Sequence, residues 1–209
     1  MKKLVLSTLA IASFLLLAGC SHSDSTAHKG PSKAEIQAAK VKQAGKKLKA
    51  TPSDKNYEAL LKAALGAKHV VTIKTAENGY KVAKITGYKL KQAKEYKAFS
   101  KAIRSTFAQV KQTKYTTKGL GFVQKGKDDF TQFTFAYSAK SIASGEPKQS
   151  AFDSADNAIT PIFDTADSYY IEPIFGSDND LNPDYGTTEN GPLNQQKRSL
   201  NSFIMETFD

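Results

Sequence analysis

The sequence predicts an α+β fold in which antiparallel hairpins and helices pack together in a single domain. Two regions have apolar residues at helical spacing, and each is followed by a pair of short β-type segments separated by a turn sequence. Helices and antiparallel hairpins that alternate along a chain are typical of the α+β class. The segment 32–209 also has a length that a single domain commonly has.

Two helices are expected before the first hairpin. Ser32 and Glu35 have the spacing of a capping box, so a lysine-rich helix is expected to begin there and to end at Gly45. In the second helix, Thr51 is the expected cap and Gly66 the expected end. The apolar residues of this second helix recur every three or four positions, as in a core helix, and they are Tyr57, Leu60, Leu61, Ala64 and Leu65.

The first hairpin joins strands expected at 69–74 and 80–88. Between them, Asn78-Gly79 supplies the positive φ angles that a tight hairpin turn needs. A long helix is then expected over 91–112, because apolar side chains line one face of it and lysines lie elsewhere. This inner face comprises Tyr96, Phe99, Ile103, Phe107 and Val110.

The second hairpin joins strands expected at 120–124 and 130–137, with a turn at 125–128. In its second strand large aromatic residues alternate with small ones, a pattern that predicts a strand buried on one face only. The C-terminal segment 193–208 has apolar residues at helical spacing, and we expect this helix to close the core.

Positive and negative charges occupy different parts of the chain. Residues 28–127 include 24 Lys and Arg against 5 Asp and Glu, whereas residues 128–209 include 4 against 14. Nearly all the basic residues are lysines, which favours diffuse attraction to anionic material over the bidentate recognition that arginine provides. We therefore expect the basic part, 32–127, to face anionic lipid or wall polymer and the acidic part, 128–209, to face outward. Alternatively, the two parts neutralise each other within the fold.

The N-terminal residues have the three parts of an export signal. Lys2 and Lys3 precede an apolar run, 4–17, that is shorter than a membrane-spanning helix requires. Small residues then lead to Leu17-Ala18-Gly19-Cys20, which closely resembles the lipobox of bacterial membrane lipoproteins. The resemblance implies cleavage before Cys20, a diacylglycerol on its sulfur and a fatty acid such as palmitate on the new N-terminus. Two or three acyl chains hold a protein firmly on a membrane.

The same resemblance implies a domain plan and a location. Residues 1–19 are expected to be the signal peptide, 20–31 a flexible tether on the lipid anchor, and 32–209 the α+β domain. The expected location is the extracytoplasmic face of the cell membrane. Nucleic acid is not an expected partner, because an exported domain does not meet it.

Composition removes several kinds of catalytic site. Cys20 is the only cysteine, so the domain has no thiol for a disulfide, a zinc site or a nucleophile. His69 is the only histidine beyond the tether, and its place at the start of an expected strand favours a structural role. Residues 121–128 spell G-x-x-x-x-G-K and then Asp128, where a phosphate-binding loop needs Ser or Thr, so a hairpin turn is favoured. No cofactor is expected.

One acidic segment has the spacing of a calcium-binding loop. Oxygen-bearing side chains occupy alternate positions and a glutamate ends the segment; these residues are Asp178, Asp180, Asn182, Asp184 and Glu189. However, Pro183 stands where such loops have glycine, and proline cannot adopt the backbone conformation that glycine takes there. An acidic, turn-rich surface loop is therefore favoured over a cation site.

The expected function is a non-catalytic binding or scaffolding role at the cell envelope. One alternative is an envelope enzyme that uses carboxylates of the acidic part. It requires that two of these lie in one cleft: Asp128, Asp129, Asp153, Asp164 or Glu172. The other alternative is a module that binds a small ligand or calcium.

Overall fold

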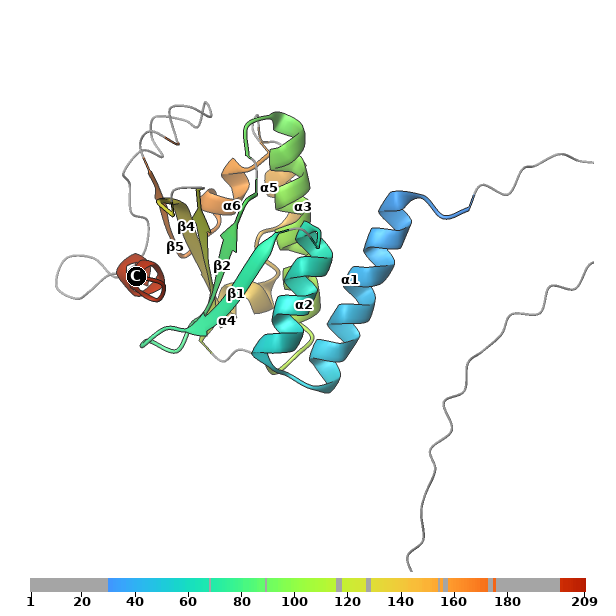
Figure 1. Cartoon of the computed structure of the whole chain (residues 1–209), viewed down its shortest axis with the longest axis horizontal. Helices are drawn as coiled ribbons and strands as arrows, with labels where there is room; N and C mark the ends of the chain where they lie inside the picture. The colour runs from blue at the N-terminus through green and yellow to red at the C-terminus, as the bar shows by residue number, and fades with distance from the viewer. Residues whose placement is uncertain are drawn as a thin grey trace, which may run out of the picture. The chain divides into compact units, whose positions relative to one another are not determined.

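The computed structural model describes residues 30–67, 69–88, 90–115, 118–126, 129–153, 155, 158–172, 175 and 200–209. Residues 31–209 form one compact unit of helices and a five-stranded sheet, which confirms the predicted α+β class (Figure 1). The described helices are α1 (Lys33–Ala50), α2 (Asp54–Leu65), α3 (Ala93–Val110), α4 (Ala139–Ser144), α5 (Gln149–Asp153), α6 (Thr160–Asp164) and α8 (Leu200–Glu206). The described strands are β1 (Val70–Thr75), β2 (Lys81–Thr86), β3 (Gly119–Lys125), β4 (Thr131–Ser138) and β5 (Ser168–Ile171).

The strands lie side by side in the order in which they occur in the chain, from β1 to β5. Both predicted hairpins are present as antiparallel pairs, β1 with β2 and β3 with β4, and β5 joins β4 in the antiparallel sense. β2 and β3 run parallel, because α3 carries the chain back along the sheet between them. The border between the basic and acidic parts falls in the turn between β3 and β4, so both parts contribute strands to one sheet.

The turn between β1 and β2 has the geometry that Asn78-Gly79 predicts. Gly79 has a φ of +85°, in the left-handed region that glycine adopts without a steric penalty. Asn78 Oδ1 accepts a hydrogen bond from the Tyr80 amide at 3.1 Å. These local preferences favour the register in which Thr75 pairs with Lys81.

α1 begins as predicted but is longer than predicted. Ser32 and Glu35 form the expected capping box, in which Ser32 Oγ accepts a hydrogen bond from the Glu35 amide. The expected end at Gly45 is wrong, since the helix continues for five further residues to Ala50. Gly45 is buried, and a Cβ at this position would overlap the side chain of Gln109. Here glycine gives α3 room to approach instead of ending the helix.

α2 begins later than predicted. Its N-cap is Ser53 rather than Thr51, and Ser53 Oγ accepts a hydrogen bond from the Asn56 amide. Gly66 caps the other end, as predicted. Of the predicted core face, Tyr57, Leu60, Leu61 and Leu65 are buried and Ala64 is half-buried.

The main core lies between one face of the sheet and the helices, and aromatic rings fill much of it. Phe122 and Phe135 on neighbouring strands stack with their ring centroids 4.6 Å apart. Phe99 of α3 meets Phe133 edge to face at 5.8 Å, and Phe163 of α6 meets the same ring at 5.5 Å. Because Phe163 belongs to the acidic part and Phe99 to the basic part, the charge border does not divide the domain.

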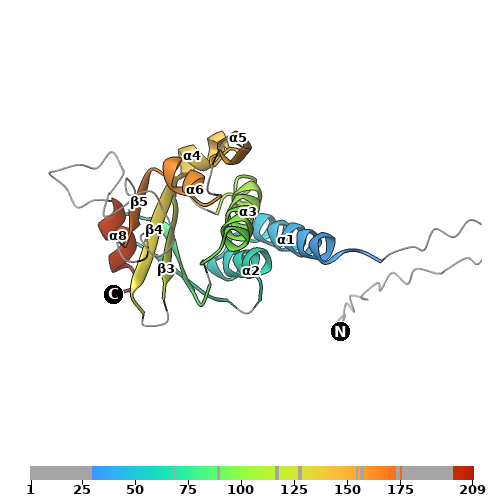
Figure 2. The same cartoon turned by 90° about the horizontal axis from the view of Figure 1, so that it is seen from above.

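The opposite face of the sheet is covered by α8, on the other side from α1, α2 and α3 (Figure 2). Leu200, Ile204 and Phe208 pack there on smaller strand residues. A Cβ at Gly121 in β3 would overlap Ile204, so the absence of a side chain lets α8 lie close to the sheet. The small residues of the strands thus form the seat of a helix.

Two expectations about this region need correction. β4 is not buried on one face only, since Thr134 and Ala136 are buried as well as the aromatic residues between them. The C-terminal helix is present from Leu200, but it forms a second, smaller core instead of closing the first. The rest of its predicted range, 193–199, lies outside the described residues.

Candidate functional site

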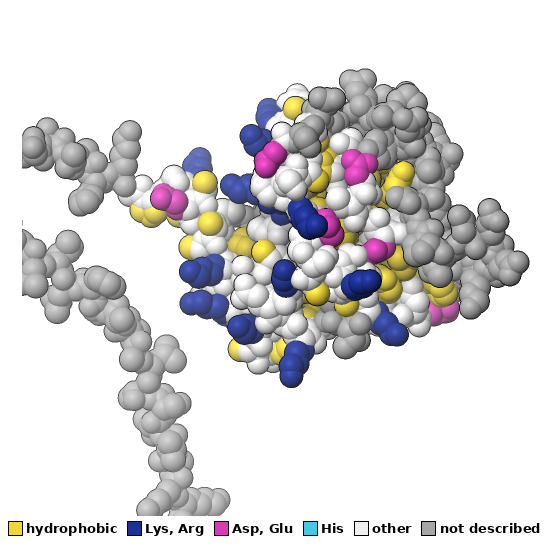
Figure 3. All heavy atoms as spheres, turned by 180° about the vertical axis from the view of Figure 1, so that it is seen from behind, with side chains coloured by type: hydrophobic (Ala, Val, Ile, Leu, Met, Phe, Trp, Pro, Cys, Tyr) yellow, Lys and Arg dark blue, Asp and Glu magenta, His cyan; other side chains and the backbone are white. Residues whose placement is uncertain are grey.

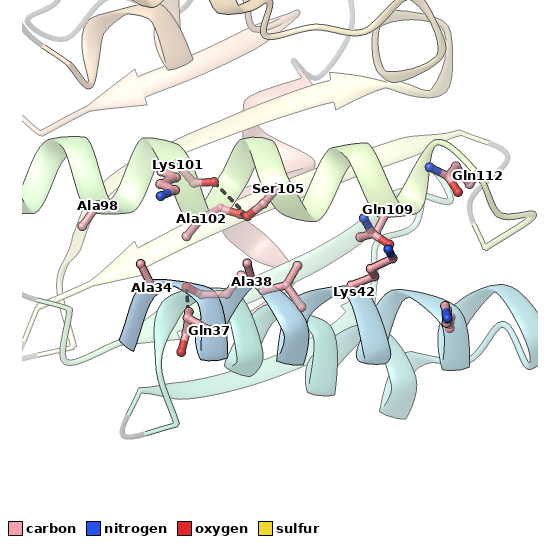
Figure 4. A pocket seen from close by; sticks show the side chains of 13 residues that line it. Ala34, Gln37, Ala38, Lys42, Ala98, Lys101, Ala102, Ser105, Gln109 and Gln112 are labelled. Carbon is pink, nitrogen blue, oxygen red and sulfur yellow. Dashed lines mark hydrogen bonds between the residues drawn. The ribbon is translucent and has the colours of Figure 1, made fainter. Parts of the chain in front are cut away.

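A groove of about 510 Å³ lies between α1 and α3 (Figure 4). Small apolar side chains form its walls, with Ala34 and Ala38 on α1 and Ala98 and Ala102 on α3. Three lysines also line it, and these are Lys42, Lys46 and Lys101. A mostly apolar cavity of this size with a few polar groups is typical of small-ligand sites.

The groove exists because α1 and α3 are in contact at only one end. There Gly45 lies against Gln109, and Val41 and Leu48 are buried beside it. In the first half of α1 almost every residue is exposed, and Ile36 has 43% of its surface accessible. The two helices therefore leave a wedge open along the first turns of α1.

A side-chain bond holds the open half of α1 on α2. Gln37 Nε2 donates a hydrogen bond to the backbone carbonyl of Ala63 in α2, and Ala64 of the same helix lines the groove. α2 therefore contributes to the floor of the groove between the two walls.

Most uncharged polar side chains along the groove already bond to backbone carbonyls. Ser105 Oγ donates to the Lys101 carbonyl at 2.8 Å, and Gln112 Nε2 donates to the Ala108 carbonyl at 3.3 Å. Gln37 is bound to α2 in the same way. The polar groups left to meet a ligand are the lysine ammonium groups and the Gln109 amide, and none of the described lining residues is acidic.

Lysines also cover the outer surface of α1 and α3, as Figure 3 shows along the edge formed by α1. On α1 these are Lys33, Lys40, Lys42, Lys46, Lys47 and Lys49, all of them exposed. Among the described residues, ion pairs involve only lysines outside α1 and α3: Lys62, Lys81, Lys125 and Lys148. Only Lys125 pairs with carboxylates of the acidic part, those of Asp129 and Asp209, each at 3.7 Å. The described parts thus neutralise each other very little.

Several predicted site residues lie outside the described residues. These include Cys20 and the whole calcium-loop candidate, which comprises Asp178, Asp180, Asn182, Asp184 and Glu189. Among the residues that the structure does describe, no group of three or more histidine or acidic side chains is placed to hold a metal ion.

The carboxylates of the enzyme hypothesis do not line the groove. Asp128 lies outside the described residues, and Asp129 is paired with Lys125 in the turn that precedes β4. Asp153 is exposed and accepts a hydrogen bond from Gln149, and Asp164 is exposed at the end of α6. Glu172 accepts a hydrogen bond from the Phe175 amide at 2.7 Å. These contacts are local.

Asp54 is the centre of a polar cluster that ties α2 to the sheet. Its carboxylate pairs with Lys81 Nζ at 2.9 Å and accepts a hydrogen bond from the Tyr115 hydroxyl at 2.8 Å. Partial burial acts to raise the pKa of Asp54, but the bonds from Lys81 and Tyr115 outweigh it and hold the pKa below the usual value. Burial and the bond to Asp54 raise the pKa of Tyr115. We assign a structural role to this cluster, because it links three segments of the fold.

Asp54→Asn is expected to lower the free energy of unfolding by roughly 1 kcal/mol at neutral pH. The folded pKa lies below the ordinary value of 3.8, so the carboxylate stabilises the fold above that pH and this contribution is lost as pH falls through the folded pKa. Urea unfolding should therefore show a difference between wild type and variant at neutral pH that shrinks below about pH 4. Glu58→Gln, which removes a partly exposed pair with Lys62, is the control and should change stability by less than about 0.5 kcal/mol.

The remaining sequence candidates have structural positions. His69 precedes β1, and its ring packs against Tyr88 with centroids 4.5 Å apart. Residues 119–125 form β3, which is followed by a turn and β4, so the G-x-x-x-x-G-K segment is part of a hairpin as the sequence suggested.

The groove itself was not predicted from the sequence. Its signal is the recurrence of alanines at helical spacing on two helices, Ala34 and Ala38 on one and Ala98 and Ala102 on the other. That signal becomes interpretable only when the two helices are known to be neighbours.

Comparison with protein-family models, curated proteins and solved structures finds no match to this chain. Within the part of the chain that the structure describes, no helix has both the length and the apolar character needed to cross a membrane.

Proposed function

We propose that this chain is a lipid-anchored protein of the extracytoplasmic face of the cell membrane, with a non-catalytic binding or scaffolding role. Cys20 is the attachment point, on the basis of the lipobox resemblance of Leu17-Ala18-Gly19-Cys20. The lysine-rich surface of α1 and α3 binds an anionic surface of phosphate groups, either in the membrane or in a wall polymer.

The observation that carries this proposal is the set of lysines on α1 that have no ion-pair partner among the described residues. Lys33, Lys40 and Lys47 recur every seven residues, so they lie in a row along one side of the helix. Each lysine close to an anionic membrane adds about 1 kcal/mol of attraction, and this fades over a Debye length of about 8 Å at physiological salt. A row of three can therefore orient the domain on such a surface.

The proposal predicts selective binding of the unlipidated chain, beginning at Ser21, to anionic vesicles. Sedimentation with phosphatidylglycerol-containing vesicles should show binding that weakens with added salt, and neutral phosphatidylcholine vesicles should show little. Replacement of Lys33, Lys40 and Lys47 by glutamine should weaken the binding by roughly a hundredfold. A soluble poly(glycerol phosphate) added as competitor distinguishes wall polymer from lipid, since tighter binding to the polymer would identify the wall as the preferred surface.

The matched control removes the same number of lysines from other surfaces of the domain. Lys55, Lys114 and Lys140 are exposed and lie outside α1 and α3. Their replacement by glutamine should weaken binding by less than about tenfold, because these positions are not on the proposed contact surface. Equal binding to neutral and anionic vesicles, or equal loss in both triple variants, would refute the proposed surface.

A further inference from the structure

We infer that the groove between α1 and α3 binds a single-chain anionic amphiphile, a long-chain fatty acid, with its carboxylate at Lys42 and Lys46. This inference relies on the proposed membrane anchoring only for the source of the ligand. The groove offers two kinds of surface in one cavity: an apolar wall of alanines and a positive rim. An amphiphile with one negative end matches both.

The length of the groove suits one acyl chain. Ala34 and Lys46 mark its ends on α1, and at 1.5 Å per residue they are about 18 Å apart. The hydrocarbon core of a bilayer is about 30 Å thick and contains two leaflets, so one chain extends over about 15 Å. A chain laid along Ala38, Ala98 and Ala102 therefore leaves the remaining length for its head group.

Charge complementarity selects the sign of the ligand. Lys42 and Lys46 are four residues apart on α1 and so share one side of the helix. In Figure 4, Lys42 lies beside Gln109, so the amide can donate a further hydrogen bond to a carboxylate. Lys101 lies toward the Ala98 end of the opposite wall, where its aliphatic stem can cover the chain while its ammonium group stays in water.

The polar side chains within the groove do not compete for this role. The donors of Gln37, Ser105 and Gln112 are already bonded to backbone carbonyls, so the wall presents mainly carbon to the ligand. A ligand with polar groups along its whole length would leave those groups unpaired, which costs free energy. An alkyl chain has no such groups.

The supply of such a ligand follows from the proposed anchor. Residues 21–32 separate Cys20 from the start of α1. A tether of this length spans at most about 43 Å when fully extended. The groove therefore stays within reach of the membrane surface, where amphiphiles with acyl chains concentrate.

The test measures fatty-acid binding in solution with no membrane present, by titration calorimetry of the unlipidated chain from Ser21. Dodecanoate below its micellar concentration should bind, and each added CH₂ should tighten binding by up to about fourfold until the chain fills the groove. Dodecyltrimethylammonium, which has the opposite charge, should bind at least about tenfold more weakly. Equal affinity for the two would overturn the inference.

Two pairs of variants locate the site. Ala38→Leu with Ala98→Leu fills the groove at exposed positions and should abolish binding, whereas Ala39→Leu with Ala108→Leu makes the same change on the exposed outer surfaces of the same helices and should not. Lys42→Gln with Lys46→Gln should weaken dodecanoate binding by about tenfold, and Lys33→Gln with Lys40→Gln should leave it unchanged. The reverse pattern in either pair would overturn the inference.

The two proposals fail independently. The filled-groove variant should retain full binding to anionic vesicles, because its lysines are intact. Conversely, the Lys33 and Lys40 variant should lose vesicle binding and retain dodecanoate binding. Circular dichroism and the thermal midpoint of each variant show whether its fold is unchanged, and a variant with a lowered midpoint is replaced by Ala34→Leu, a third exposed position on the groove wall.

Discussion

Replacement of Cys20 by alanine is expected to move this protein from the membrane fraction to the soluble fraction. Each buried CH₂ of an acyl chain contributes about 0.8 kcal/mol, so the loss of two or three chains should lower membrane partitioning by at least roughly a thousandfold. The lipidated protein should remain on membranes through a wash at high salt, because apolar insertion is not screened by ions. The measurement is membrane fractionation of a bacterial host with metabolic labelling by palmitate.

Ser21→Ala is the matched control for this anchor. It changes the neighbouring residue and leaves the sulfur of Cys20 in place, so labelling and fractionation should match wild type. A Cys20→Ala protein that stays on membranes after the high-salt wash would contradict the proposed anchor. A share of that protein that stays at low salt and leaves at high salt would instead be attributed to the lysines of α1.

Phe135→Ala is expected to cause the largest loss of stability among the substitutions considered. The side chain is fully buried in β4, and its ring is stacked on Phe122 with further edge contacts to Phe99 and Phe163. Removing a buried phenylalanine leaves a cavity and costs about 3–5 kcal/mol, out of a typical total of about 5–15 kcal/mol. The thermal midpoint should therefore fall by roughly 10 °C, as calorimetry or circular dichroism can show.

Phe130→Ala provides the matched control. This phenylalanine lies just before the same strand but has 73% of its surface exposed, so its replacement should change the free energy of unfolding by less than about 0.5 kcal/mol. Because the two variants make the same chemical change, the difference between them measures burial. A loss below about 1 kcal/mol for Phe135→Ala would show that the aromatic core is not packed as described.

The secondary structure was largely predictable because its signals are local. The inner face of α3, the Asn78-Gly79 turn and the capping box at Ser32 each depend on residues within a few positions of one another. The errors arose where a distant segment decides the outcome. Gly45 continues a helix because α3 packs against it, and Thr134 and Ala136 are buried because α8 covers them.

The candidate site was less predictable than the fold. Lys42 and Lys46 read as part of a solvated lysine surface, and the alanines of α3 read as ordinary helix residues. Their combination in one groove depends on the approach of α1 to α3 at Gly45 and on the separation of the two helices beyond it. No local pattern in either helix encodes that separation.

By itself the sequence determined the α+β class, the two hairpins with their intervening helix, and the division of charge at the β3–β4 turn. It also carries the lipobox resemblance at Cys20, which stays a prediction. Only the tertiary structure decided that β2 and β3 are parallel, that α8 covers the second face of the sheet, and that a lysine-rimmed groove opens beside α1. The reason is physical: periodicity and turn chemistry act between near neighbours in the chain, whereas packing joins side chains that the sequence keeps far apart.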